Sequence, residues 1–89
     1  MGKRRVKSYH ARVEVRLKPG HLDPEGETTK KSLVDLKYGV KRVDVVKVYE
    51  LDLDAPSIEE AKKQVDEMCR KLLANPIKDD YKFEIKGTK

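Results

Sequence analysis

The sequence has one cysteine and no tryptophan in 89 residues. A single cysteine excludes an internal disulfide, and an unpaired thiol is typical of a reducing compartment. The chain also lacks any apolar run near the roughly 20 residues that span a bilayer. Its basic start is not followed by the apolar core of a signal peptide. We therefore expect a cytoplasmic protein with no membrane partner.

The short chain limits how much core can form. Eighty-nine residues predict one domain, and a domain of this size buries a modest share of its surface. Small proteins gain further stability from disulfides, metals or oligomerisation. With no disulfide available, we expect a homo-oligomer.

The net charge of +5 is concentrated near the start of the chain. Residues 1–8 contain four of the 21 basic residues and no acidic one, while the other 17 face 16 acidic residues. We interpret residues 1–8 as a basic flexible tail, 9–86 as the single domain and 87–89 as a C-terminal tail. The folded part is then nearly neutral, and we expect no nucleic-acid partner.

Two segments alternate as half-buried strands do. Apolar and polar residues alternate from Tyr9 to Lys18, and again from Tyr81 to Lys86. Pro19-Gly20 ends the first segment. A helix over 24–37 should follow, with Asp23 as N-cap, Pro24 at the first helical position and Gly39 as its stop. Its strongest apolar marks, Leu33 and Leu36, should pack on a sheet.

The stretch "RVDVVKVYELDLDA" (42–55) changes its apolar phase midway. Val43 and Val45 are odd-numbered, like Tyr49, Leu51 and Leu53, whereas Val46 and Val48 are even-numbered and apolar too. One long strand that bends or bulges near Lys47 would explain this, as would two short strands or a strand covered on both faces. The last alternative makes Val46 and Val48 candidates for self-association.

The clearest helix follows "APS". Ser57 and Glu60 form a capping box, and Asn75-Pro76 stops the helix. Its predicted buried face comprises Ile58, Ala61, Val65, Met68, Cys69, Leu72 and Leu73. The predicted fold is an α+β sandwich of order β-α-β(bent or split)-α-β. Its antiparallel or mixed sheet carries two helices on one face, somewhat like ferredoxin-like folds.

The sequence offers no set of catalytic groups. Cys69 lies on the apolar helix face, near the helix end that disfavours a thiolate, so we interpret it as core filler. His10 and His21 lack metal-ligand spacing, and Glu50, Asp52 and Asp54 alternate as an exposed strand face does. No phosphate-loop, dinucleotide, serine-hydrolase or zinc-protease motif occurs. We predict no catalytic, metal or cofactor site in this chain.

Three stretches, in this order and spacing, resemble the PurS family: "VRLKPGHLDPEG", "YELDLDA" and "MCRKLLANPIKDDYKFEI". The resemblance covers about Tyr9 to Ile85. PurS is the small subunit of phosphoribosylformylglycinamidine synthase. That enzyme uses glutamine and ATP to convert formylglycinamide ribonucleotide to formylglycinamidine ribonucleotide. The resemblance implies that PurQ carries the glutaminase site and PurL the amidination site with ATP and Mg, and that PurS joins them and helps ammonia pass.

The resemblance further implies dimers or tetramers formed through the sheets. For the partner interface we chose turns and helix ends, which present rigid backbone. Those candidates are Lys18, Pro19, Gly20, Leu22, Asp23 and Pro24, with Arg70, Asn75 and Pro76 as a second group. The alternative function is a ferredoxin-like regulatory module that binds a small molecule at a subunit interface.

Overall fold

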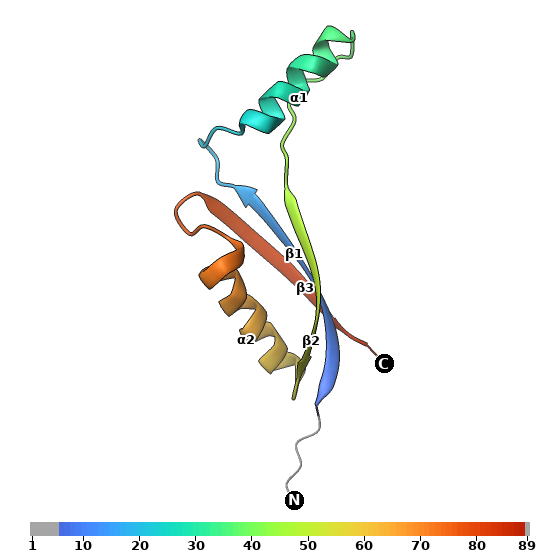
Figure 1. Cartoon of the computed structure of the whole chain (residues 1–89), viewed down its shortest axis with the longest axis vertical. Helices are drawn as coiled ribbons and strands as arrows, with labels where there is room; N and C mark the ends of the chain where they lie inside the picture. The colour runs from blue at the N-terminus through green and yellow to red at the C-terminus, as the bar shows by residue number, and fades with distance from the viewer. Residues whose placement is uncertain (1–5, 89) are drawn as a thin grey trace, which may run out of the picture.

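The computed structural model describes residues 6–88 and shows an elongated molecule of 65 × 29 × 13 Å (Figure 1). Its elements are β1 (Lys7–Leu17), α1 (Pro24–Asp35), β2 (Lys47–Ala55), α2 (Ile58–Met68), a π-helical turn η1 (Cys69–Leu73) and β3 (Asp79–Gly87). Most of the tail predicted over 1–8 lies outside the described residues, and its last two residues, Lys7 and Ser8, already belong to β1.

The sheet is antiparallel, in the order β2-β1-β3. Central β1 has the predicted alternation, since Tyr9, Ala11, Val13 and Val15 are buried and the even-numbered residues between them are not. They pack under α2, which contributes Ala61 and Val65. The α+β class and the antiparallel sheet are thereby confirmed.

The position of α1 differs from the prediction of two helices on one sheet face. Figure 1 shows α2 against the sheet and α1 projecting beyond the end of the sheet. Leu36, predicted to pack on the sheet, is 67% exposed. Residues 39–46 account for this position of α1. They continue the line of β2 away from the sheet, so the helix that precedes them also lies beyond the end of the sheet (Figure 1).

Capping interactions set both ends of α1, and the C-terminal end differs from the prediction. Asp23 is the N-cap as predicted, and its side chain accepts from the Gly26 N–H. The helix ends before Gly39, because Lys37 takes the left-handed conformation at φ 75°. The Lys37 N–H donates to Val34 O and the Tyr38 N–H to Leu33 O, which is the Schellman pattern. The predicted glycine stop was therefore wrong.

The middle stretch holds a single strand. β2 begins at Lys47, where the apolar phase changes, and residues 39–46 have no regular secondary structure. The stretch thus holds neither a bulge nor a second short strand, and the extended residues 39–46 lie in line with β2 (Figure 1). Val48 pairs with Glu14 on the sheet face away from α2 and is 41% exposed. Whether a second subunit covers Val46 and Val48 stays a prediction.

The second helix matches the prediction until its last turn. Ser57 caps it by accepting from the Glu60 N–H, and the helical run stops ahead of Asn75-Pro76 at Leu73. In η1 the Ala74 N–H donates to Cys69 O, five residues back. This wider turn rotates Leu72 out of the predicted buried face, so Leu72 is 82% exposed.

Candidate functional site

Two turns that lie far apart in sequence meet at one end of the sheet. β1 ends in the Lys18-Pro19-Gly20 turn, and residues 75–78 lead into β3 beside it (Figure 1). The Lys18 N–H donates to Lys78 O at 2.7 Å, and Lys18 Nζ lies 2.8 Å from Asp80 Oδ1. We call this region the turn surface: Lys18, Pro19, Gly20, Leu22, Asn75, Pro76 and Ile77.

Internal hydrogen bonds hold the second turn. The Asn75 N–H donates to Asp79 Oδ2, and the Ile77 N–H donates to Asn75 Oδ1, both at 2.9 Å. The Asp79 N–H donates to Asn75 O at 2.8 Å. This turn presents a fixed backbone before any partner arrives.

The turn surface carries exposed apolar side chains. Leu22 is 76% exposed and Ile77 80%, and the neighbouring Leu72 of η1 is 82% exposed. Neither Ile77 nor Leu72 was predicted as a contact residue, because Ile77 follows Asn75-Pro76 in a loop and Leu72 falls on the apolar face of a regular helix. Exposed apolar side chains on rigid backbone are typical of protein–protein contact surfaces.

Arg70, in the π-helical turn η1, forms an ion pair with Asp66 of α2. Its Nε is 2.9 Å from Asp66 Oδ2, and Tyr81 Oη donates to Asp66 Oδ1 at 2.6 Å. These two bonds, that of Tyr81 first, lower the pKa of Asp66. Asp66 thus links α2 to β3 through Tyr81, and Arg70 pairs with the same carboxylate from one turn further along the helical run.

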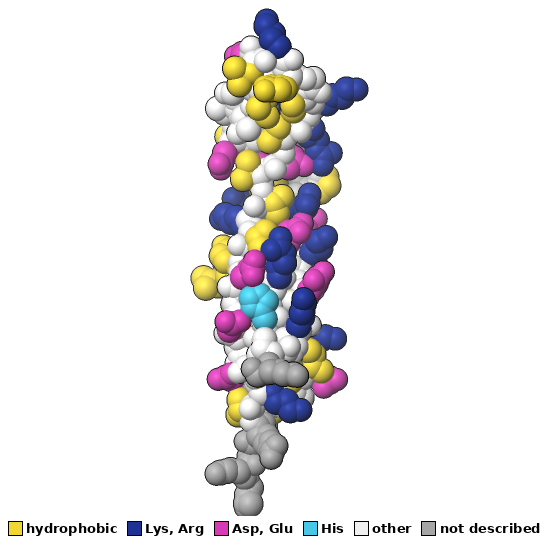
Figure 2. Space-filling view, turned by 90° about the vertical axis from the view of Figure 1, so that its right-hand side faces the viewer, with side chains coloured by type: hydrophobic (Ala, Val, Ile, Leu, Met, Phe, Trp, Pro, Cys, Tyr) yellow, Lys and Arg dark blue, Asp and Glu magenta, His cyan; other side chains and the backbone are white. Residues whose placement is uncertain are grey.

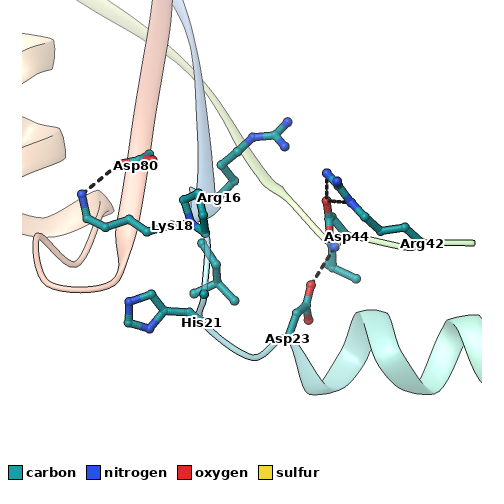
Figure 3. A pocket seen from close by; sticks show the side chains of 11 residues that line it. Arg16, Lys18, His21, Asp23, Arg42, Asp44 and Asp80 are labelled. Atoms are coloured by element: carbon teal, nitrogen blue, oxygen red, sulfur yellow. Dashed lines mark hydrogen bonds and ion pairs between the residues drawn. The ribbon is translucent and has the colours of Figure 1, made fainter.

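A hollow of about 350 Å³ lies between the turn surface and the base of α1 (Figure 3). The charged side chains at its rim are paired within the chain. Lys18 is bound to Asp80, and Arg42 Nε lies 2.9 Å from Asp44 Oδ2. The hollow is not foreseeable from sequence, because segments 16–23 and 42–45 meet only in the fold.

Asp23 connects the two segments that border this hollow. Its Oδ1 accepts from the Gly26 N–H and its Oδ2 from the Val45 N–H, both at 2.9 Å. The bond from Val45, followed by that from Gly26, lowers the pKa of Asp23. One ionised carboxylate thus fixes the start of α1 to the segment that returns from it. Pro24, at the first helical position, is exposed beside it.

Cys69 is core filler as predicted, fully buried between α2 and the sheet. Burial, and then the charge of Asp66, raise the pKa of its thiol. A thiol held protonated and away from solvent is a poor nucleophile.

Replacing Cys69 by alanine should lower the free energy of unfolding by about 1–2 kcal/mol, as other small core truncations do. Urea unfolding of the two proteins measures this. Activity of the synthase that the resemblance to the PurS family implies should stay unchanged at moderate temperature, and its loss in a folded variant would contradict the structural interpretation of Cys69.

His10 bridges two carboxylates on the open sheet face. Its Nδ1 lies 2.7 Å from Asp52 Oδ1 and its Nε2 lies 3.0 Å from Glu50 Oε1. A neutral imidazole has one N–H and can donate to only one of them. The two bonds, that to Asp52 first, therefore raise the pKa of His10 above its ordinary 6.5.

This raised pKa predicts a pH dependence of stability. The contribution of His10 should be fully present below pH 6.5, the ordinary value, and lost as pH rises through the higher pKa of the folded state. The melting temperature should therefore be lower at pH 9 than at pH 6. The fall should be smaller in His10→Gln, and equal slopes for the two proteins would contradict this role.

Within residues 6–88, no three His, Cys, Asp or Glu side chains are placed to hold a metal ion. In the same part of the chain, every helix is too short or too polar to cross a membrane.

Comparison with known proteins gives consistent matches. The family model described as "PurS: Phosphoribosylformylglycinamidine (FGAM) synthase" matches residues 10–87. The phosphoribosylformylglycinamidine synthase subunit PurS of Archaeoglobus fulgidus is 50% identical over 72 residues, which are 80% of this chain and 90% of that protein.

Solved structures agree over the same span. The crystal structure of Methanocaldococcus jannaschii PurS superposes with a TM-score of 0.80 at 38% identity, covering 91% of this chain and 99% of that one. A chain of the PurLQS structure from Thermotoga maritima superposes with a TM-score of 0.78 at 28% identity, covering 91% and 98%.

Proposed function

The chain belongs to the PurS family, and from that membership we propose that it is the non-catalytic subunit that joins and couples the two active subunits of phosphoribosylformylglycinamidine synthase. The family places it in this enzyme and in purine biosynthesis. The observation that carries the proposal is the family match over residues 10–87, which spans nearly all of the described fold.

The proposed partners are the PurL and PurQ subunits and further copies of this chain. A PurS chain of matching fold occurs in the Thermotoga maritima PurLQS structure, which supports a three-subunit assembly here. In this proposal ATP and Mg act in PurL, this chain holds no cofactor, and the assembly works in the cytoplasm.

Coupling has a physical reason. Ammonia released into water at neutral pH is mostly protonated to ammonium, which is not a nucleophile. A subunit that closes the path between two sites keeps ammonia neutral and raises its effective concentration at the acceptor. Such a subunit needs fixed turns and apolar contacts rather than a titrating group.

The turn surface is the proposed partner face. Its backbone is fixed by its own hydrogen bonds, and Leu22 and Ile77 are exposed on it. Most of the binding energy of an interface comes from a few side chains that become buried when the partner binds.

Reconstitution with purified PurL and PurQ tests the proposal. Formylglycinamidine ribonucleotide formation is measured with glutamine and then with ammonium chloride, with and without this chain. Glutamine-dependent turnover should require the chain, whereas ammonia-dependent turnover should not.

If neither rate depends on the chain with its cognate partners, the coupling function is wrong. A melting-temperature shift with a purine-pathway metabolite alone would then favour the small-molecule-binding module.

A further inference from the structure

The Arg70 side chain has a fixed position and still has N–H groups left to donate. Its Nε donates to Asp66 Oδ2 at 2.9 Å, and Tyr81 Oη donates to Asp66 Oδ1 at 2.6 Å. A guanidinium carries further N–H donors on Nη1 and Nη2. Within residues 6–88, neither of these two groups donates a hydrogen bond. Arg70 is thus oriented by one carboxylate and can still receive another.

The other arginines in the described part of the chain differ from Arg70 in this respect. Figure 2 shows the side of the molecule opposite α2, where positive and negative side chains lie next to one another. Terminal guanidinium nitrogens are already paired within the chain for Arg12 with Glu50, Arg16 with Glu14, and Arg42 with Asp44. The hydrogen bond of Arg70 comes from Nε instead, so internal pairing leaves its terminal amino groups open.

Arg70 reaches the surface where the second helix widens. It follows Cys69 in η1, and its side chain is 57% exposed. Wide helical turns of this kind often occur at functional sites. The next residue, Lys71, is 73% exposed, and its Nζ lies 3.6 Å from Glu67 Oε2, so it adds a loosely paired positive charge. This end of the helical run is therefore accessible to an acidic group from outside the chain.

We propose that Arg70 binds a carboxylate of a partner subunit through Nη1 and Nη2. Paired hydrogen bonds from a guanidinium to a carboxylate are stronger than those between neutral groups, and they fix the angle at which the two groups meet. The inference rests on the proposed function, because it assigns the chemistry of one contact in that assembly.

Asp66 and Tyr81 act as positioning residues for this contact. Binding usually costs the rotamer freedom of a long side chain. Here the ion pair with Asp66 holds the Arg70 side chain, and Tyr81 of β3 holds Asp66. The bond from Tyr81, followed by that from Arg70, lowers the pKa of Asp66, so its carboxylate is ionised at neutral pH. Much of the ordering of Arg70 is therefore complete before the partner arrives.

Substitutions at two adjacent basic residues test the contact. With an N-terminal fluorescent label on each chain, the measured quantity is the concentration of PurL and PurQ that gives half-maximal binding. Arg70→Lys should raise it at least about tenfold, because an ammonium keeps the charge but lacks the planar pair of donors. Lys71→Gln is the matched control, since it removes an exposed charge next to Arg70 and should change the value less than about threefold. Melting temperatures check that each variant is folded.

A double-mutant cycle separates positioning from general stability. Tyr81→Phe removes the hydrogen bond to Asp66 and should weaken binding about threefold or more in the natural background. In the Arg70→Lys background the same change should have little further effect, because the paired donors that Tyr81 helps to orient are gone. A purely structural role of Tyr81 would weaken binding equally in both backgrounds.

Several results would overturn the inference. Arg70→Lys could bind as tightly as the natural chain, Lys71→Gln could lose as much affinity, or Tyr81→Phe could act equally in both backgrounds. A changed oligomeric state of the isolated Arg70→Lys chain would place the carboxylate in a second copy instead. Glutamine-dependent turnover is measured separately. A natural chain that binds through Arg70 without affecting turnover would refute the coupling function alone, and one that binds neither PurL nor PurQ would refute both.

Discussion

Replacing Gly26 by alanine is expected to destabilise the protein by about 1–3 kcal/mol, the range for an added methyl in a tightly packed site. Glycine-to-alanine changes inside helices usually stabilise by roughly 1 kcal/mol. Here the sign should reverse, because Gly26 is buried where an added Cβ would collide with the backbone oxygen of Val43 and lie 2.8 Å from Asp23 Oδ2. The added methyl would separate α1 from segment 43–45.

Gly39→Ala is the matched control. An added Cβ at Gly39 meets nothing within 4 Å, so its free energy of unfolding should stay within about 0.5 kcal/mol of the natural protein's. Urea unfolding compares the two variants. The close contact between Gly26 and the Val43 backbone would be refuted if Gly26→Ala were as stable as Gly39→Ala.

Replacing Ile77 by glutamate should lower glutamine-dependent turnover of the assembled enzyme at least tenfold. Truncating an interface anchor costs at least about 2 kcal/mol of binding, and about 1.4 kcal/mol already corresponds to a tenfold change. A buried carboxylate in place of an apolar side chain adds a desolvation cost. Because Ile77 is 80% exposed in the isolated chain, the melting temperature should not change.

Lys62→Glu serves as its control, since Lys62 is exposed on α2, away from the turns. The readouts are turnover with glutamine, turnover with ammonium chloride, and co-elution with PurL and PurQ. Full activity of Ile77→Glu at low subunit concentration would remove the turn surface as the partner face.

Local patterns in the sequence predicted the elements well. Strict alternation from Tyr9 to Lys18 located the central strand, and the Asp23 and Ser57 caps located both helix starts. These features depend on neighbours a few residues apart, which any reader of the sequence can see. The same holds for Cys69, whose burial follows from its position among apolar residues on one helix face.

Placement in space was less predictable. The apolar residues of α1 indicate that the helix packs on another surface. They do not indicate that it lies beyond the end of its own sheet (Figure 1). Leu72 was assigned to the core because a regular helix was assumed, and the π turn at Cys69–Leu73 changes the period. The meeting of the Lys18 and Asn75 turns depends on strand register, which sequence alone does not supply.

The π turn places core and surface residues side by side in one short segment. Cys69, its first residue, and Ala74, directly after it, are buried in the core, whereas Leu72 between them is 82% exposed. Removing one residue within Cys69–Leu73 would restore a regular helix and turn Leu72 and Ala74 together around the helix axis, so Leu72 could not be redirected without moving Ala74 out of the core. The surface that this chain offers its partners is thus coupled, through one extra residue, to the packing that keeps the chain folded.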